Sequence, residues 1–507
     1  MTHRPRHPDA HRPRTADQER TMRPTLQLLD PALVERVLGE AYELLEEPGI
    51  RVHDAEAVEL LAGAGARVDG TKVRIPAAVV RDALASAPGS FDLHDRSGRP
   101  AVRYGQGVVQ FDPGSSGVHI LDPETLEHRD SMADDLVRVV KVAEGLAQYE
   151  AQSTAIVCHD VPAEIGDLYR LFLVQLHSAK PIVTGSFAAP TLGTMIDLLA
   201  IDAGGHEALA QRPRAVFDVC PTPPLTWSDL GARSLIELAR ARVPAELVSM
   251  PLAGAAAPVT LIGSVVQHAA ECLSGIAIHQ LARPGSPVVW GGAPSIVDMR
   301  SGATPLGAIE TAMIDAAYVQ VGRFLGLPTH GYLGGTDAKI VDAQAGLETG
   351  ASVVVGALAG IDLISGAGML DFLRCQSPEK LVVDAEAIAA AQRLASGIGT
   401  PTETLATAAF AAAGPDGRFL EIAETRKLFR SEQHLPSEVI DRASLAGWRN
   451  AGSTDAFTRA RARVDYLLAA YERPALEPAV ERELIERVRR EAAPYGLTEL
   501  PGLPSGA

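Results

Sequence analysis

Four aromatic residues stand out because each lies near the end of a short apolar run, while aromatic residues make up only 5% of the chain. They are Phe111, Phe187, Trp290 and Tyr332. Ring faces attract organic cations by about 0.5–2 kcal/mol per contact. We therefore predict that these residues surround the cation of a quaternary ammonium substrate. The alternative is that each ring fills the core.

Arg300 is the one arginine in a long glycine-containing segment, SIVDMRSGATPLGAIE (295–310). A guanidinium group can bind a carboxylate through two parallel hydrogen bonds. Arg300 is therefore our candidate for binding a substrate carboxylate. The alternative is that Arg300 pairs with Asp298 and only orders the loop.

A second polar segment, GGTDAKIVDAQAGLE (334–348), follows soon after His330. Dense polar residues between a strand and a helix are typical of functional loops on a rigid scaffold. We predict from position alone that His330, Asp337 and Glu348 are catalytic. The alternative is that Thr336 or Asp337 caps the following helix.

Histidine and cysteine residues give no convincing metal site. His268, Cys272 and His279 share one helix face, but that helix should lie away from the strand ends, so we expect packing residues there. Cys158 and His159 are adjacent, and adjacent residues on a strand point to opposite faces. The four cysteines show no paired spacing, which is typical of reduced, buried thiols. We predict no metal.

Eight short apolar runs, each followed by a helical stretch, set the organisation of the chain. Apolar strands without polar alternation are buried on both faces, as in a parallel sheet. Eight strand–helix units predict an α/β fold, specifically a (β/α)8 TIM barrel, with its site at the carboxyl ends of the strands. The runs are 108–113, 151–158, 181–187, 215–221, 245–251, 287–294, 328–335 and 362–368.

The chain divides into four parts on this basis. We expect a disordered tail over residues 1–24 and an N-terminal helical and hairpin cap over 25–107, with a turn near 96–99. The barrel then occupies 108–376. Residues 377–507 are predicted to be helical and to pack on the barrel or between subunits, including two amphipathic helices near 455–472 and 476–493.

Charge and hydropathy narrow the classes of partner. The chain has 46 basic and 63 acidic residues, a net charge of −17. This argues against nucleic acid, which binds a basic face, and suits a small cation. The Arg-, His- and Pro-rich start lacks the apolar core of a secretory signal, and no run is long enough to span a membrane. We therefore expect a cytoplasmic protein.

Several motifs resemble those of the trimethylamine methyltransferase family of corrinoid-dependent enzymes. They are DMRSGA (298–303), GGTDAKIVDAQAGLE (334–348), LISGAGML (363–370) and EQHLPSEVIDR (432–442) with the following Trp448. The resemblance implies a (β/α)8 barrel. It also implies methyl transfer from a methylamine to the Co(I) centre of a separate corrinoid protein, with no cofactor bound tightly by this chain.

The chain departs from the trimethylamine-using members at one place. Those members carry pyrrolysine where the seventh strand ends, whereas residues 331–337 are all ordinary here. The chain thus resembles the pyrrolysine-independent members that demethylate quaternary amines such as glycine betaine. A quaternary nitrogen leaves as a neutral amine and needs no activation, so the protein contributes mainly orientation. Arg300 would then meet a betaine carboxylate, and Asp337 and Glu348 would order the loop or balance charge.

We accordingly predict a quaternary-amine methyltransferase with a corrinoid-protein partner and a homo-oligomeric assembly. Two alternatives stay open. The barrel could use another methyl donor or acceptor, for example of the tetrahydrofolate type. It could also be a non-catalytic subunit that binds a quaternary amine or organises a corrinoid protein.

Overall fold

The computed structural model describes residues 23–188 and 191–503. Eight parallel strands form its centre, one inside each predicted apolar run, so the strand count is confirmed. The second strand is much shorter than the apolar run that contains it, and Cys158 and His159 lie beyond the end of that strand. The strands are β6 (Gln110–Pro113), β9 (Gln152–Ser153), β10 (Ile182–Gly185), β11 (Ala215–Val219), β13 (Ala245–Ser249), β15 (Val288–Gly292), β17 (His330–Tyr332) and β18 (Leu363–Ala367).

These strands follow one another around a ring made of two arcs. One arc has the order β15-β13-β11-β10-β9 and the other β17-β18-β6, all parallel. A single parallel bridge between Trp290 and Thr329 joins β15 to β17. At the other junction, the Glu150 backbone N–H donates to the Phe111 carbonyl oxygen at 2.9 Å. Regular pairing is interrupted at both junctions, yet the α/β barrel architecture is as predicted.

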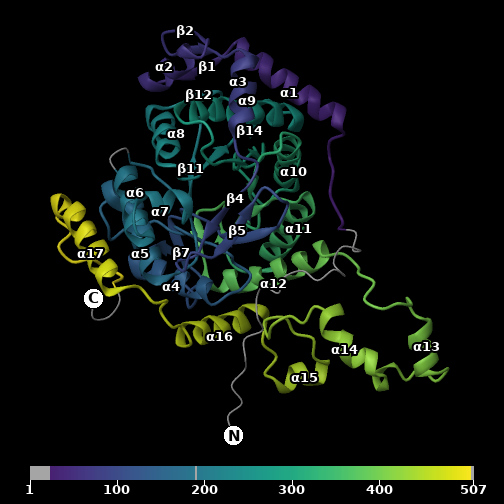
Figure 1. The fold of residues 1–507 in the computed structure, drawn as a ribbon. Coiled ribbons are helices and arrows are strands. Elements are labelled where there is room, and N and C mark those ends of the chain that lie inside the picture. The colour runs from purple at the N-terminus through teal and green to yellow at the C-terminus, as the bar shows by residue number, and fades with distance from the viewer. Residues whose placement is uncertain (1–22, 189–190, 504–507) are drawn as a thin grey trace.

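Helices cover the outside of the ring (Figure 1). Strand residues that point outward, such as Phe217, Leu247 and Ile364, share one large apolar core with these helices. Helices on the outer face explain why the strands carry apolar residues on both faces. The covering helices are α4 (Ala133–Glu144), α5 (Gly166–His177), α6 (Thr191–Ala203), α7 (His206–Gln211), α8 (Asp229–Ala241), α9 (Leu261–Ala282), α10 (Ile309–Phe324), α11 (Ala343–Ala359) and α12 (Pro378–Ala395).

A hairpin closes the amino-terminal end of the ring. Its strands are β4 (Phe91–His94) and β5 (Pro100–Tyr104), so the predicted turn is confirmed. The hairpin lies across the centre of the ring in Figure 1. Residues of the hairpin, of four barrel strands and of the segment just before β9 form a second, separate apolar cluster. Its members are Leu93, Val102, Tyr104, Ala151, Val183, Val216, Val289 and Leu363.

The N-terminal cap packs on α9. The cap consists of α1 (Pro31–Glu46), β1 (Ile50–Val52), α2 (Ala55–Gly63), β2 (Arg67–Asp69), β3 (Lys72–Arg74) and α3 (Ala77–Ser86), and β1 pairs in parallel with β12 (Thr226–Trp227) of the barrel. Within the described residues, α9 is the one helix whose length and composition would allow it to cross a membrane. Because 83% of its most apolar window is buried by the barrel and the cap, it is a core helix here.

Short strands and C-terminal helices complete the chain. The rim of the ring carries β7 (His119–Leu121), β8 (His128–Asp130), β14 (Leu252–Ala253), β16 (Ser295–Ile296), β19 (Met369–Leu370) and β20 (Cys375–Gln376). The two predicted amphipathic helices are confirmed as α16 (Ala456–Ala469) and α17 (Pro478–Ala492), which pack back on the body. Between them and α12, an extension projects outward (Figure 1), with α13 (Thr407–Ala413), α14 (Ala423–Glu432) and α15 (Leu445–Asn450).

A buried ion pair ties α12 to the loops that follow β17 and β18. The Lys380 ammonium group donates to Asp384 Oδ2 at 2.5 Å, to Thr349 Oγ1 at 2.9 Å and to the Gly334 carbonyl oxygen at 3.2 Å. Asp384 Oδ2 also accepts the Gly368 N–H at 2.7 Å. Burial lowers the pKa of Lys380 and raises that of Asp384, so both charges depend on each other.

We predict that Lys380→Met lowers the free energy of unfolding by about 3–5 kcal/mol, because it leaves the Asp384 charge buried without a partner. Denaturant-induced unfolding followed by circular dichroism measures this change. Arg482→Met, at an exposed position of α17, is the control and should change stability by less than about 0.5 kcal/mol. Equal stabilities of the two variants would show that the pair does not hold these loops.

Candidate functional site

Six polar side chains point into the ring, from His330 and Glu246 near the starts of their strands to residues near the carboxyl ends, where barrels of this type hold their sites. Asp218 and Ser365 each lie two residues beyond an inward-facing apolar residue, Val216 and Leu363, so strand alternation places them on the same face. The six are Asp112 (β6), Asp218 (β11), Glu246 (β13), His330 and Tyr332 (β17) and Ser365 (β18), and we call them the interior polar chain.

One half of the interior polar chain runs from Asp112 to Glu246. Ser365 Oγ donates to Asp112 Oδ1 at 2.6 Å, and His330 Nε2 lies 2.7 Å from the same Ser365 oxygen. The other ring nitrogen, Nδ1, contacts Glu246 Oε2.

The other half runs from Glu246 to the mouth of the ring. Tyr332 OH donates to Asp218 Oδ2 at 2.6 Å. The Asp218 carboxyl group lies beside that of Glu246, and the neighbouring Glu246 charge raises the pKa of Asp218 further. Two buried carboxyl groups this close do not both ionise readily, so this pair holds at least one proton.

Burial shifts every titratable group of the interior polar chain toward its neutral form. It raises the pKa of Asp112, Asp218 and Glu246 well above their usual range and lowers the pKa of His330. Six buried atoms here form no hydrogen bond among the described residues: Tyr104 OH, Asp112 Oδ2, Asp218 Oδ1, Glu246 Oε1, and the contacting pair Glu246 Oε2 and His330 Nδ1. Unpaired acceptors of this kind attract a ligand that carries positive charge or hydrogen-bond donors.

Two glycines make room for these carboxyl groups. A Cβ atom on Gly291 would lie 2.3 Å from Glu246 Oε1, so only glycine fits at that position of β15. A Cβ atom on Gly185 would lie 3.3 Å from the Phe187 ring and 3.6 Å from Asp218 Cβ. The ring is therefore widened where the carboxyl groups and the aromatic side chain of Phe187 meet.

The structure separates the four predicted aromatic residues into two groups. Tyr332 belongs to the interior polar chain and stacks on the His330 ring at 5.3 Å, while Phe187 lies at the mouth with 59% of its surface exposed. Phe111 and Trp290 instead face outward into the helix layer. Trp290 Nε1 donates to the Tyr318 carbonyl oxygen at 3.0 Å. Alternation along β6 and β15 turns both side chains away from the ring interior.

The predicted polar loop residues meet at the rim and not in the interior. Asp337, Glu348 and Arg300 line a rim groove of about 810 Å³. Glu348 accepts the Thr336 hydroxyl and, at 2.8 Å, the Asp337 N–H, and Asp337 accepts the N–H groups of residues 306 and 307. These contacts order the loop after β17, one of the two roles considered from the sequence.

Arg300 pairs with Asp298, as the loop-ordering alternative predicts. Its side chain is 92% exposed and forms two hydrogen bonds to Asp298, at 2.8 and 3.1 Å. The pairing lowers the pKa of Asp298 to about 2. Of the three residues predicted to be catalytic, only His330 lies in the interior polar chain.

Four members of the interior polar chain were not selected as site residues from the sequence: Asp112, Asp218, Glu246 and Ser365. A signal for three of them was present. A carboxylate inside an apolar run, as in QFDP, AVFDV and AELVS, is costly to bury and therefore unusual in a strand. Ser365 carried no such signal, because a buried serine is common.

His268, Cys272 and His279 of α9 lie behind the ring and serve packing. His268 stacks on the Tyr318 ring at 4.1 Å, and its Nε2 lies 2.9 Å from the Gly291 carbonyl oxygen. Burial lowers the pKa of both histidines to about 3. His268 thus supports the glycine that makes room for Glu246.

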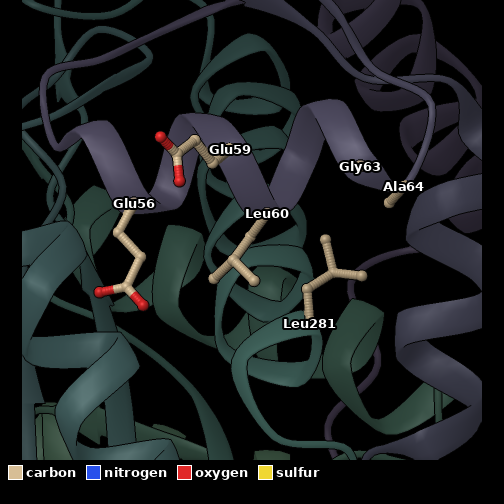
Figure 2. Close-up of a pocket in the computed structure, with 6 residues that line it drawn as sticks. All are labelled: Glu56, Glu59, Leu60, Gly63, Ala64 and Leu281. Atoms are coloured by element: carbon tan, nitrogen blue, oxygen red, sulfur yellow. The ribbon is translucent and has the colours of Figure 1, made fainter.

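A different pocket, of about 410 Å³, lies between α2 and the end of α9. Figure 2 shows Glu56, Glu59 and Leu60 on α2 and Leu281 on α9 beside this pocket. The α9 helix leaves the carboxyl end of β13 and returns the chain to the start of β15, so its last turn lies toward the opposite end of the ring. The interior polar chain does not reach this pocket.

We predict that Glu246→Gln makes stability less dependent on pH. Burial raises the pKa of folded Glu246 above its usual 4.5, so the folded state keeps a proton that the unfolded state releases. The stability of the wild type therefore falls as the pH rises above about 4.5. In the Glu246→Gln variant, the loss of unfolding free energy with rising pH should be smaller by up to about 1.4 kcal/mol per pH unit.

Urea unfolding between about pH 5 and 8 measures these slopes. Glu59→Gln, on the exposed face of α2, is the matched control and should keep the wild-type slope. If Glu246→Gln kept it as well, Glu246 would not hold a proton in the folded protein.

The chain is similar to known proteins over most of its length. The sequence matches the family described as trimethylamine methyltransferase (MTTB) over residues 2–496. A trimethylamine methyltransferase of Desulfitobacterium hafniense (strain DSM 10664 / DCB-2) is 30% identical over 457 residues, covering 90% of this chain and 92% of that protein. A glycine betaine methyltransferase of D. hafniense (strain Y51) is 27% identical, covering 91% and 96%.

A solved structure agrees with the fold. The crystal structure of the Methanosarcina barkeri monomethylamine methyltransferase superimposes with a TM-score of 0.51, over 86% of this chain and 88% of that one, at 13% sequence identity. The match to the family extends over nearly the whole chain. The chain is therefore a methyltransferase and belongs to the trimethylamine methyltransferase family.

Proposed function

We propose that this methyltransferase moves a methyl group from a small quaternary ammonium compound to the Co(I) centre of a corrinoid held by a separate protein. The observation that carries the proposal is the interior polar chain, whose buried, unpaired carboxyl oxygens lie beneath Tyr332 and Phe187. Carboxyl groups and aromatic faces together suit a cation that has no hydrogen to donate.

Residues 331–337 support a quaternary donor, because they are all ordinary. A quaternary nitrogen already carries positive charge, and it leaves as a neutral tertiary amine. The protein then needs no group that activates the donor. Its residues bind the cation, keep water away from it and hold one methyl group toward the mouth. Tyr332 is held for this task by Asp218 and by stacking on His330.

The rim supports a protein partner as the methyl acceptor. Met250, Val259 and Met299 follow β13, β14 and β16, and they are 38%, 76% and 85% exposed. Because β14 pairs with β16, these loops lie side by side. Exposed apolar side chains around a mouth are typical of a surface that binds another protein. The corrinoid of that protein would supply Co(I), the nucleophile that accepts the methyl group.

We predict methyl transfer when the purified chain is mixed with a Co(I) corrinoid protein and tetramethylammonium, choline or glycine betaine. The change in corrinoid absorbance measures it. The double variant Met250→Glu, Met299→Glu should raise KM for the corrinoid protein at least tenfold, since it buries two charges at the docking surface. Its affinity for the ammonium compound should not change.

Leu394→Glu, at a half-exposed position of α12 outside the rim, is the control for added charge. Absence of methyl transfer from every quaternary amine in the panel would refute the proposed reaction. A normal KM in the double variant would refute docking at this rim.

We also propose that copies of the chain self-associate through the extension formed by α13, α14 and α15. The helices α14 and α15 bury no residue within the chain, and Phe410, Leu420 and Leu445 are 62%, 85% and 61% exposed. Helices this short are not stable alone in water, so another surface must cover them.

Light scattering should therefore give a multiple of 53.4 kDa for the wild type. Phe410→Glu combined with Leu420→Glu should lower the mass toward that of one chain, because it buries charge in the contact. A wild-type mass of one chain would contradict self-association.

A further inference from the structure

The carboxyl groups of Asp218 and Glu246 hold a proton between them. A cationic substrate at this position would need a negative charge instead. The partners of the three interior carboxyl groups are a serine, a tyrosine, a histidine and one another. Asp218 is the member of the pair that reaches the mouth, while Glu246 is fully buried beneath it.

Geometry and burial place this proton on the carboxyl pair. Glu246 Oε2 contacts His330 Nδ1, and the other side of the Glu246 carboxyl group faces Asp218. Burial raises the pKa of both carboxyl groups, and the Glu246 charge raises that of Asp218 further. Two buried carboxyl groups this close therefore hold at least one proton between them.

We propose that the site exchanges one proton for one quaternary ammonium ion. When the ion binds, the O–H bond that holds this proton on the carboxyl pair breaks, and the proton passes to water at the mouth. The negative charge that remains on the carboxyl pair balances the ammonium ion. This inference rests on the proposed function, since it takes the quaternary ammonium ion as the substrate.

The reason is the cost of an isolated charge in a buried place. A quaternary ammonium ion has no N–H group, so it cannot be stabilised by hydrogen bonds to a neutral carboxyl group. A cation buried without an opposite charge is strongly disfavoured. Release of the proton supplies the opposite charge from a group already in position.

The same exchange favours release of the product. After the methyl group leaves, the tertiary amine is neutral and no longer balances the carboxylate. The pair then takes a proton back from water at the mouth and returns to its neutral form. Binding thus releases one proton and product departure takes one up, so the enzyme is unchanged over the cycle.

Burial moves the other titratable groups around the pair toward their neutral forms. Burial raises the pKa of the facing tyrosines and cysteines, that of Cys220 to about 12. Asp112 and Asp362 also face the pair or His330, and burial raises their pKa values too. The facing groups are Tyr104, Asp112, Cys220, Cys272, Tyr318, His330, Tyr332 and Asp362.

Calorimetry of the purified full-length chain with tetramethylammonium as the probe tests the exchange, without a corrinoid protein. Titrations in phosphate and in Tris, which differ in ionisation enthalpy, give the number of protons released. The wild type should release about one proton per ion bound, and its affinity should rise by up to tenfold per pH unit. Glu246→Gln should release none and should bind with an affinity that does not depend on pH.

Glu271→Gln is the matched control. Glu271 is a buried carboxyl group on α9 that accepts the Leu225 N–H and the Ser249 hydroxyl outside the ring interior. The Glu271→Gln variant should release one proton per tetramethylammonium ion bound, like the wild type. Tyr332→Phe provides a second test should Glu246→Gln not fold. It removes the hydrogen bond that stabilises ionised Asp218, so the rise in affinity should move to higher pH.

The outcomes separate the two proposals. No binding of tetramethylammonium by the wild type would overturn both the proposed function and the exchange. Binding without proton release, or equal release by the wild type and Glu246→Gln, would overturn the exchange alone. An unmoved pH dependence in Tyr332→Phe would also overturn it. Proton release by the wild type and by Glu271→Gln, and not by Glu246→Gln, is the result we expect.

Discussion

The contact between the Glu246 carboxyl group and the His330 ring can persist only where water is excluded and where each group has a further partner. Much of the barrel serves these two conditions. Helix α9 covers the outside of the strands, and Tyr104 on the hairpin lies beneath the ring of His330, 6.4 Å between ring centres. Gly291 leaves the space that Glu246 occupies. The ion pair of Lys380 then holds the loops that surround the mouth.

The fold could be predicted from the sequence because parallel strands buried on both faces appear as short apolar runs between amphipathic helices. All eight runs contain a strand, and the hairpin and the two last amphipathic helices are where the pattern places them. Strand lengths could not be predicted. The run over 151–158 contains only the two-residue strand Gln152–Ser153. Its other apolar residues are buried in a loop, and the sequence pattern does not distinguish a buried loop from a buried strand.

The site was less predictable, because one residue of register decides which face a side chain occupies. Phe111 and Trp290 lie on the right strands and on the outer face, whereas Asp112 is the inward neighbour of Phe111. Of the four aromatic residues, Tyr332 and Phe187 thus lie in the ring and at its mouth, whereas Phe111 and Trp290 lie on the outer face. Partners across the ring could not be inferred either. Glu246 and His330 are far apart in sequence, and only the closed order of strands brings them together.

The hairpin that closes the ring has a consequence for how the chain is made. Its apolar residues precede all eight strands, and Tyr104 shares its cluster with Leu363, about 260 residues later. At a ribosomal speed of about 5–20 residues per second, those side chains wait roughly 13–50 s for their last partner. During synthesis this protein therefore presents an uncovered β-hairpin for much longer than a typical small domain needs to fold, and chaperones that bind exposed strands have time to act on it.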